Sequence, residues 1–354
     1  MEIFMEETMD KKTDPNVEPE EQEIRYKELS PLQMILRRFF RSRLSVVGLV
    51  ILAALFFFAF AGPPIMHALG YEWYETDTDR TPTIKRSGYE ITDAVDANGN
   101  PVKTYQFIDN EVTINSYAPM SSSHPLGTDE KGMDVLVRLM YGGRISLTLG
   151  FVVIILETII GIIMGGISGY FGGWIDQLIM RLVDIINCIP TLPILLIASV
   201  VLDSWQVEAQ MRIYYLMVIM TVFGWSGTAR MVRGQILYLR EQEYIVACEV
   251  MGIPTWRRIF KHLVPNIMPQ LIVSMTLGLG SIILYESTLS YLGLGIPLPY
   301  AAWGTMISSS TDPVTMANYP TLWIPAGILI VLAVLAFNFV GDGLRDAMDP
   351  KAKR

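Results

Sequence analysis

The chain has 354 residues, a formal net charge of −8, 51% hydrophobic residues and a mean hydropathy of +0.37. This composition is too apolar for a single soluble domain, so the chain is expected to lie in a lipid bilayer. The two cysteines, Cys188 and Cys248, fall in an apolar run and in a polar loop, which excludes a disulfide framework or a thiolate metal site built from them.

The first 30 residues form an acidic segment with few apolar side chains. Residues 1–29 carry ten acidic and four basic residues. This composition predicts that residues 1–30 are a disordered cytosolic tail. The apolar run that begins at Leu44 is not followed by a convincing small-residue cleavage site. We therefore expect residues 31–62 to be a retained membrane anchor and not a signal peptide.

Six stretches are long and apolar enough to be predicted as membrane-crossing helices. A hydrocarbon core of about 30 Å requires about 20 apolar helical residues. The stretches are residues 44–62, 145–168, 178–201, 213–230, 267–290 and 323–341. The predicted fold class is an all-α polytopic membrane protein with six transmembrane helices, of which residues 143–343 form the core.

Basic residues predict the orientation of these spans, because cytoplasmic loops carry an excess of Lys and Arg. The loop 231–266 and the C-terminal tail 344–354 are rich in basic residues, whereas the loop 291–322 has none. Both termini are therefore predicted to be cytosolic in a multi-pass protein of the cell membrane. The arginines directly before the first span are Arg37, Arg38, Arg41 and Arg43.

Residues 63–142 are predicted to be an extracytoplasmic insert, since they are too many for a simple connection. The sequence ITDAVDANGNPVKTYQFI alternates polar and apolar residues on both sides of Asn98-Gly99. Asn-Gly tolerates the positive φ angles of a tight hairpin turn, so the insert is predicted to contain a β-hairpin. A flexible hydrophilic loop is the alternative.

The cytosolic loop 240–266 is predicted to contain two short amphipathic helices. The first is expected to close at Gly252 in a left-handed conformation. The second is expected to begin near Thr255 as N-cap and to stop at Pro265, which has no N–H for the helical ladder.

The second of these helices has an apolar side and a basic rim. Ile253, Trp256, Ile259 and Phe260 are expected to form an apolar projection, flanked by Arg257, Arg258 and Lys261. Such a projection suits the groove of a soluble partner. A helix that lies on anionic lipid would show the same pattern, so the residues alone leave the two interpretations open.

This loop resembles that of the binding-protein-dependent ABC importer permeases, whose pattern is E-A-A-x-x-x-G, nine residues, and I-x-L-P. The chain departs from the pattern in having Val246 for the acid, His262 for Ile and Val264 for Leu. The residues at matching positions are Ala247, Cys248, Gly252 and Pro265. The resemblance implies that these residues and the segment between them, including Pro254, couple the chain to an ATPase.

Four further blocks resemble the C-type permease subunit of di- and oligopeptide importers. They are HPLGTDEKGMDVLVRLMYGGRISLTLG at 124–150, GYFGGWIDQLIMRLVDI at 169–185, ESTLSYLGLGIPLPYAAWGTM at 286–306 and LAFNFVGDGLRDAMDP at 335–350. The resemblance implies the type I importer permease fold, a second homologous permease, two cytosolic ATPases that bind ATP and Mg²⁺, and an extracytoplasmic peptide-binding protein. No cofactor is expected on this chain.

Enzyme and nucleic-acid functions find no support in the sequence. The nearest string to a phosphate-binding loop, Gly127 to Gly132, is followed by Met133 where that motif has Lys. None of the three histidines belongs to a zinc motif, and no G-x-S-x-G motif occurs. The basic residues border the predicted spans and do not form a separate basic domain.

Four polar residues within or beside the predicted spans are candidates for the translocation path. Ionisable groups inside a membrane usually face a cavity or a partner, although a single acid per helix also commonly bonds a neighbouring helix. The candidates are Glu157, Asp184, Asn187 and Glu286. Gly161, Gly165 and Gly169 are instead expected to let two helices approach closely, and Pro190 and Pro193 to kink the third span.

The sequence alone leaves two alternatives to peptide import open. Importers of the same class carry nickel chelates, glutathione or sugars, and substrate identity resides mostly in the receptor. A stand-alone carrier driven by an ion gradient would need intramembrane acids but no ATPase.

Overall fold

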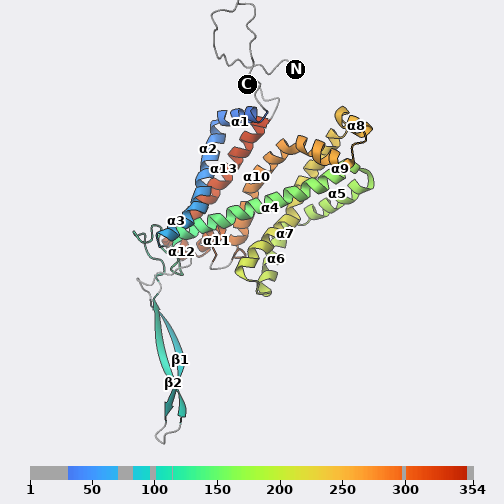
Figure 1. Ribbon diagram of the computed structural model, residues 1–354. Coiled ribbons are helices and arrows are strands. Elements are labelled where there is room, and N and C mark those ends of the chain that lie inside the picture. The colour runs from blue at the N-terminus through green and yellow to red at the C-terminus, as the bar shows by residue number, and fades with distance from the viewer. Residues whose placement is uncertain (1–30, 71–82, 96–100, 114, 297–299, 349–354) are drawn as a thin grey trace, which may run out of the picture.

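The computed structural model describes residues 31–70, 83–95, 101–113, 115–296 and 300–348. Apart from one two-stranded sheet, the described elements are helices (Figure 1). The predicted acidic tail and residues 349–354 lie outside the described residues. The long helices are α1 (Pro31–Arg41), α2 (Arg43–Phe56), α4 (Val135–Phe171), α5 (Gly173–Cys188), α6 (Thr191–Ser204), α7 (Ala209–Leu239), α10 (Val264–Tyr291) and α13 (Ile324–Met348).

Short helices lie at the two ends of the bundle. Helix α1, the end of α13, α8 (Glu243–Val250) and α9 (Thr255–Arg257) lie at one end, which we call the α1 end (Figure 1). Helices α3 (Gly62–Ala68), α11 (Trp303–Ile307) and α12 (Pro313–Asn318) lie at the other, which we call the hairpin end (Figure 1). The chain thus separates the loop 240–266 from the predicted insert by the full length of the bundle.

Four helical segments are long and apolar enough to cross a membrane, and a fifth is added if α5 and α6 count as one bent span. The four are Arg43–Ala68, Val135–Phe171, Thr255–Tyr291 and Pro320–Met348. Helices cover most of each of the six predicted stretches, but α7, which holds residues 213–230, is not among these membrane-crossing segments. The chain is a multi-pass membrane protein, and the count of six spans stays a prediction.

The predicted third span, residues 178–201, is not one helix. It breaks between α5 and α6, whose axes differ in direction by 76°. Ile189 and Pro190 at the break have ψ angles of 120° and 115°, which are extended and not helical. A residue before proline is driven out of the helical region, and proline supplies no N–H, so a full break replaces the predicted kink.

Prolines do not end helices at two places, one of which is Pro265, where the sequence predicts an end. The first predicted span continues through Pro63 and Pro64 into α3, and the loop helix continues through Pro265 into α10. A π-helical turn precedes each proline: η1 (Phe57–Ala61) and η2 (Arg258–Leu263). The wider turn bonds each N–H to the carbonyl five residues back, which displaces the carbonyl that the proline ring would otherwise meet.

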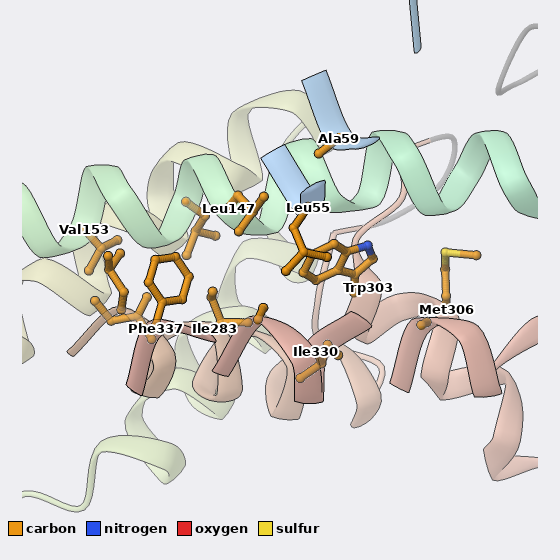
Figure 2. Packing of buried hydrophobic residues seen from close by; sticks show 14 of the residues in the cluster. Leu55, Ala59, Leu147, Val153, Ile283, Trp303, Met306, Ile330 and Phe337 are labelled. Carbon is orange, nitrogen blue, oxygen red and sulfur yellow. The ribbon is translucent and has the colours of Figure 1, made fainter. Parts of the chain in front are cut away.

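The core packs α4 against α7 on one side and α10 and α13 on the other. Figure 2 shows side chains of α2, η1, α4, α10, α11 and α13 meeting in one apolar cluster, which includes Leu55, Leu147, Ile283, Trp303 and Phe337. Trp303 is fully buried, and its Nε1 donates to the Leu139 carbonyl oxygen at 2.9 Å. This bond satisfies the indole N–H and fixes α11 against the start of α4.

Glycines bring α4 and α7 into close contact, as the sequence predicts for Gly161, Gly165 and Gly169. A Cβ added at these positions would lie 2.6 Å from Thr228, 2.4 Å from the Ala229 carbonyl oxygen and 2.9 Å from the Arg233 carbonyl oxygen. The prediction that these glycines serve packing is confirmed, because no larger residue fits between the two backbones.

The predicted insert contains the antiparallel strands β1 (Thr83–Val95) and β2 (Pro101–Thr113), which extend away from the bundle (Figure 1). Thr83 lies opposite Thr113, and Val95 lies opposite Pro101. The predicted Asn98-Gly99 turn itself lies outside the described residues. Strands of this length reach about 40 Å, so the paired ends Val95 and Pro101 lie far from the paired ends Thr83 and Thr113.

Candidate functional site

Helix α8 ends in a left-handed glycine at the α1 end. Gly252 has a φ angle of +73°, which confirms the predicted closure. Its N–H donates to the Glu249 carbonyl oxygen at 2.9 Å, and the Ile253 N–H donates to the Cys248 carbonyl oxygen at 3.0 Å. These two bonds form a Schellman cap, which satisfies the last carbonyls of α8 and turns the chain into α9.

The second loop helix differs from the prediction at both of its ends. Thr255 is the first helical residue, and Pro254, with ψ 144°, occupies the N-cap position without a side-chain cap. The helix does not stop at Pro265 but runs through η2 into α10, giving one continuous helical segment over Thr255–Tyr291. The loop is therefore joined to the membrane-crossing α10 without a flexible connection.

An exposed apolar surface forms where α8 meets α9. Val250 is 83% exposed, Met251 69%, Trp256 62% and Phe260 50%. The guanidinium of Arg257 lies 5.6 Å from the centroid of the Trp256 ring, a distance typical of a cation–π contact. We call Val250, Met251, Trp256 and Phe260 the docking surface, after the contact role that is proposed for them below.

Two residues predicted for this surface point inward. Ile259 is only 4% exposed and packs with Ile236 of α7 and Leu263 of η2. Arg258 is also buried, forms an ion pair with Glu249 at 2.9 Å and lies over the Tyr170 ring at 5.4 Å. Arg258 therefore fastens α9 to α8 and to the end of α4, and the prediction that it forms the charged rim is wrong.

The other residues predicted for coupling divide between surface and interior. Ala247, Pro254 and Pro265 are exposed, Ile253 and Thr255 are half-buried, and Cys248 is buried. Beneath them, Arg240 donates to the carbonyl oxygens of Gly169 at 3.1 Å and Tyr170 at 3.2 Å, which caps the C-terminus of α4. The docking surface thus rests on the ends of α4, α7 and α10.

Two of the four path candidates bond to α7 through their side chains. The Asp184 carboxylate accepts from Arg230 at 2.9 Å, with both side chains more than half exposed, at 53% and 55%. The Asn187 side-chain oxygen accepts from the Ser226 hydroxyl at 2.8 Å. These bonds form a polar stripe along the contact between α5 and α7.

Glu157 reaches the same helix from α4. A Cβ added at Gly224 would lie 1.7 Å from Glu157 Oε1, so the carboxyl group occupies the space that this glycine leaves open. Three candidates from two different helices therefore converge on one stretch of α7. Sequence reasoning missed their partners, although Ser226 and Arg230 are four residues apart and so share one face of α7.

Glu286 belongs to a separate buried network. It is 3% exposed and accepts from the Ser146 hydroxyl at 3.0 Å and from the Ser290 hydroxyl at 2.7 Å. Ser146 in turn accepts from the Trp303 backbone N–H at 3.3 Å. The structure places Glu286 between α4, α10 and α11, away from the stripe on α7, where it ties α11 to the bundle.

Two family models match the chain. Residues 158–354 match the family described as "Binding-protein-dependent transport system inner membrane component". Residues 30–82 match "N-terminal TM domain of oligopeptide transport permease C".

Curated relatives match much of the chain. The oligopeptide transport system permease protein OppC of Bacillus subtilis (strain 168) is 43% identical over 68% of this chain and 76% of its own length. The dipeptide transport system permease protein DppC of Alkalihalophilus pseudofirmus is 34% identical over 96% of both chains. Among solved structures, the MetNI methionine ABC transporter in inward-facing conformations has 19% identity and a TM-score of 0.41, covering 60% of this chain and 97% of that chain, a likeness too weak to carry an argument.

With a family match over more than half of its length, the chain belongs to the binding-protein-dependent transport system inner membrane components.

Proposed function

We propose that the chain is one of two homologous permease subunits of an ATP-driven peptide importer, with six spans, the type I fold and both termini in the cytosol. Its partners are a second permease, two cytosolic ATPases that bind ATP and Mg²⁺, and an extracytoplasmic peptide-binding protein. The relatives named for oligopeptide and dipeptide transport support the cargo. The observation that carries the proposal is the docking surface of Val250, Met251, Trp256 and Phe260.

The position of the docking surface supports a cytosolic partner. It lies at the α1 end, where α1 carries Arg37, Arg38 and Arg41 and where α13 ends after Arg345 (Figure 1). Basic residues at the ends of spans favour the cytosolic side of a membrane. An apolar helix face presented to water there suits the groove of a soluble ATPase.

The continuous helix offers a way for the ATPases to act on the membrane core. A force on Trp256 is transmitted through η2 to α10, because Ile259 and Leu263 are packed against α7 and no loop intervenes. Closure of the ATPases would move this helix and switch the cavity between inward-open and outward-open states. The coupling thus depends on the cap at Gly252 that fixes α8 against α9.

Gly252→Val is expected to uncouple ATP hydrolysis from uptake. A β-branched residue at a φ angle of +73° is strained by about 1–2 kcal/mol or more, so the cap opens and the docking surface shifts. The measurement is ATP hydrolysis and peptide uptake by the reconstituted assembly. Gly252→Asn is the matched control, since Asn tolerates the left-handed conformation. Normal coupling in the valine variant would contradict the role of this cap.

The polar stripe on α7 is proposed to line the translocation path. Arg230 is the last residue of the predicted span 213–230, so the exposed Asp184–Arg230 pair sits at the cytosolic boundary of the membrane in a six-span topology, about 14 Å from the end of α7. Charged groups in hydrocarbon are costly, whereas a water-filled cavity between the two permeases would solvate them. Glu157 and Asn187 contact the same stretch of α7 farther from this end, at Gly224 and Ser226.

Breaking this ion pair is expected to slow uptake without preventing assembly. Asp184→Asn and Arg230→Gln each leave one uncompensated charge at the path, whereas the double exchange Asp184→Arg with Arg230→Asp restores the pair. We expect the single variants to lower the uptake rate several-fold and the exchange to recover part of it. The measurement is peptide uptake by assemblies of equal ATPase content. Wild-type rates in both single variants would remove the pair from the path.

Proteoliposomes separate the importer from a carrier driven by an ion gradient. The importer requires the second permease, both ATPases, the receptor and ATP for uptake of a labelled peptide. Uptake by this chain alone under an ion gradient would support the carrier instead. Replacing the peptide with a nickel chelate, glutathione or a sugar in the same assay tests the other cargoes.

A further inference from the structure

A cavity of about 640 Å³ opens at the hairpin end of the bundle. Segments distant in the sequence form its wall: the turns before α4, the connection from α6 to α7, the end of α10 and the helices α11 and α12. Ligand pockets in proteins commonly measure about 300–1,000 Å³. None of the path candidates and no residue of the docking surface lines this cavity.

The two guanidinium groups in the wall are already neutralised. Arg138 forms an ion pair with Asp129 at 3.0 Å, and Arg212 bonds the carboxylate of Asp203 and the Leu294 carbonyl oxygen at 3.3 Å. Both arginine side chains are buried, at 8% and 6% exposed. Each guanidinium is thus paired with a carboxylate, although Nε of Arg212 has no hydrogen-bond partner among the described residues.

Beside the exposed ammonium group of Lys131, the cavity presents several hydrogen-bond acceptors. The hydroxyl groups of Ser308, Ser309 and Thr311 donate to the carbonyl oxygens of Thr305, Met306 and Ser308 at 2.7–2.8 Å, which leaves their lone pairs for a ligand. Asp312 is exposed, and Thr315 donates to it from both its backbone N–H and its hydroxyl. These bonds from Thr315 hold the pKa of Asp312 below its ordinary value, so the group is an anion at neutral pH.

The balance of charge around the cavity is negative. Four carboxylates, of Asp129, Glu130, Asp203 and Asp312, face three cations, of Lys131, Arg138 and Arg212. Lys131 lies 3.7 Å from Glu130, but both side chains are more than half exposed, so this ion pair is weak and leaves Glu130 available to a ligand. Asp312 has no ion pair among the described residues. A primary ammonium group has three donors and a positive charge, and therefore matches both the acceptors and the charge of this cavity.

We propose that this cavity binds the amino-terminal ammonium group of a peptide at the extracytoplasmic entrance of the path, with Asp312 and Glu130 supplying the charge. The inference rests on the proposed peptide import. The hydroxyl oxygens of Ser308, Ser309 and Thr311 accept from the ammonium group or from the first backbone N–H groups. Binding at this position orients the peptide with its amino end toward α11 and α12.

Carbodiimide cross-linking tests the site without transport. The reagent joins a free amine to a nearby carboxylate, and mass spectrometry locates isotopically labelled trialanine on the purified assembly. We expect the label on Asp312 or Glu130, and none with N-acetyl-trialanine, which has no ammonium group. Label on a carboxylate of the opposite end, such as exposed Glu241, to an equal extent would overturn the proposal. So would a receptor lysine linked to these carboxylates in place of the peptide.

Two substitutions test the same site in uptake. Asp312→Asn removes the charge but keeps a residue that caps α12 as well as Asp does, and Glu130→Gln removes an exposed charge. We expect the double variant to raise the KM for trialanine about tenfold with unchanged maximal rate, and to leave N-acetyl-trialanine uptake unaltered. An equal change for both peptides would overturn the proposal. Failure of the proposed peptide import would give a different result from failure of this site, because the wild-type assembly would then transport neither peptide.

Discussion

Trp256→Ala is expected to abolish stable association with the cytosolic ATPases while leaving the permease folded. The side chain is 62% exposed, so its removal creates no cavity in the core. Large aromatic side chains at the centre of an interface typically contribute about 2 kcal/mol or more, which corresponds to roughly 30-fold weaker binding. Co-purification of the ATPases with the tagged permease, at matched membrane levels, measures the effect.

Trp205→Ala is the matched control for this experiment. Trp205 is 72% exposed, but it follows the C-terminus of α6, away from the docking surface at the α1 end. We expect this variant to retain the ATPases at the wild-type level. If Trp256→Ala also retains them, or if both variants lose them equally, the surface is not the docking site. An interfacial helix bound to lipid would give the first of these results.

Gly165→Ala is expected to weaken the packing of the membrane core. The added Cβ would lie 2.4 Å from the Ala229 carbonyl oxygen, a backbone atom that cannot rotate away. Helices α4 and α7 must separate, and overpacking of this kind costs about 1–3 kcal/mol. A lower melting temperature of the purified protein and a reduced yield in membranes measure the loss.

Gly227→Ala makes the same change at a position with open space. No heavy atom of a neighbouring element in the described structure lies within 4 Å of a Cβ built at Gly227 on α7. Alanine favours the helix by about 1 kcal/mol relative to glycine, so this variant should be at least as stable as the wild type. Equal destabilisation by both substitutions would show that α4 and α7 do not meet as described.

The sequence predicts the local features of the loop better than its orientation toward the core. The left-handed Gly252 follows from residue type, because glycine adopts that conformation without strain. The inward positions of Arg258 and Ile259 do not follow, because the π-helical turn at Arg258–Leu263 shifts the face that a regular helix would present. A single sequence gives no recognisable signal for the π-helical turn η2. It therefore does not predict that the helix continues through Pro265.

Long-range partners are the second part that the sequence alone does not supply. Glu157, Asp184 and Asn187 were predicted as path candidates from their polarity, but their common contact with α7 depends on tertiary packing. Glu286 had the same polarity and lies instead in the network of Ser146 and Ser290. Composition identifies the costly groups in a membrane, whereas packing decides which of them share one face.

Site-specific photo-cross-linking tests the central claim that the segment around Gly252 binds a cytosolic ATPase. A photo-reactive benzoylphenylalanine replaces Trp256 in one sample and Trp205 in another, and the whole assembly is irradiated in native membranes. The account predicts a permease–ATPase adduct from position 256 and none from position 205. Adducts with lipid alone at position 256, or with the extracytoplasmic receptor, would contradict it.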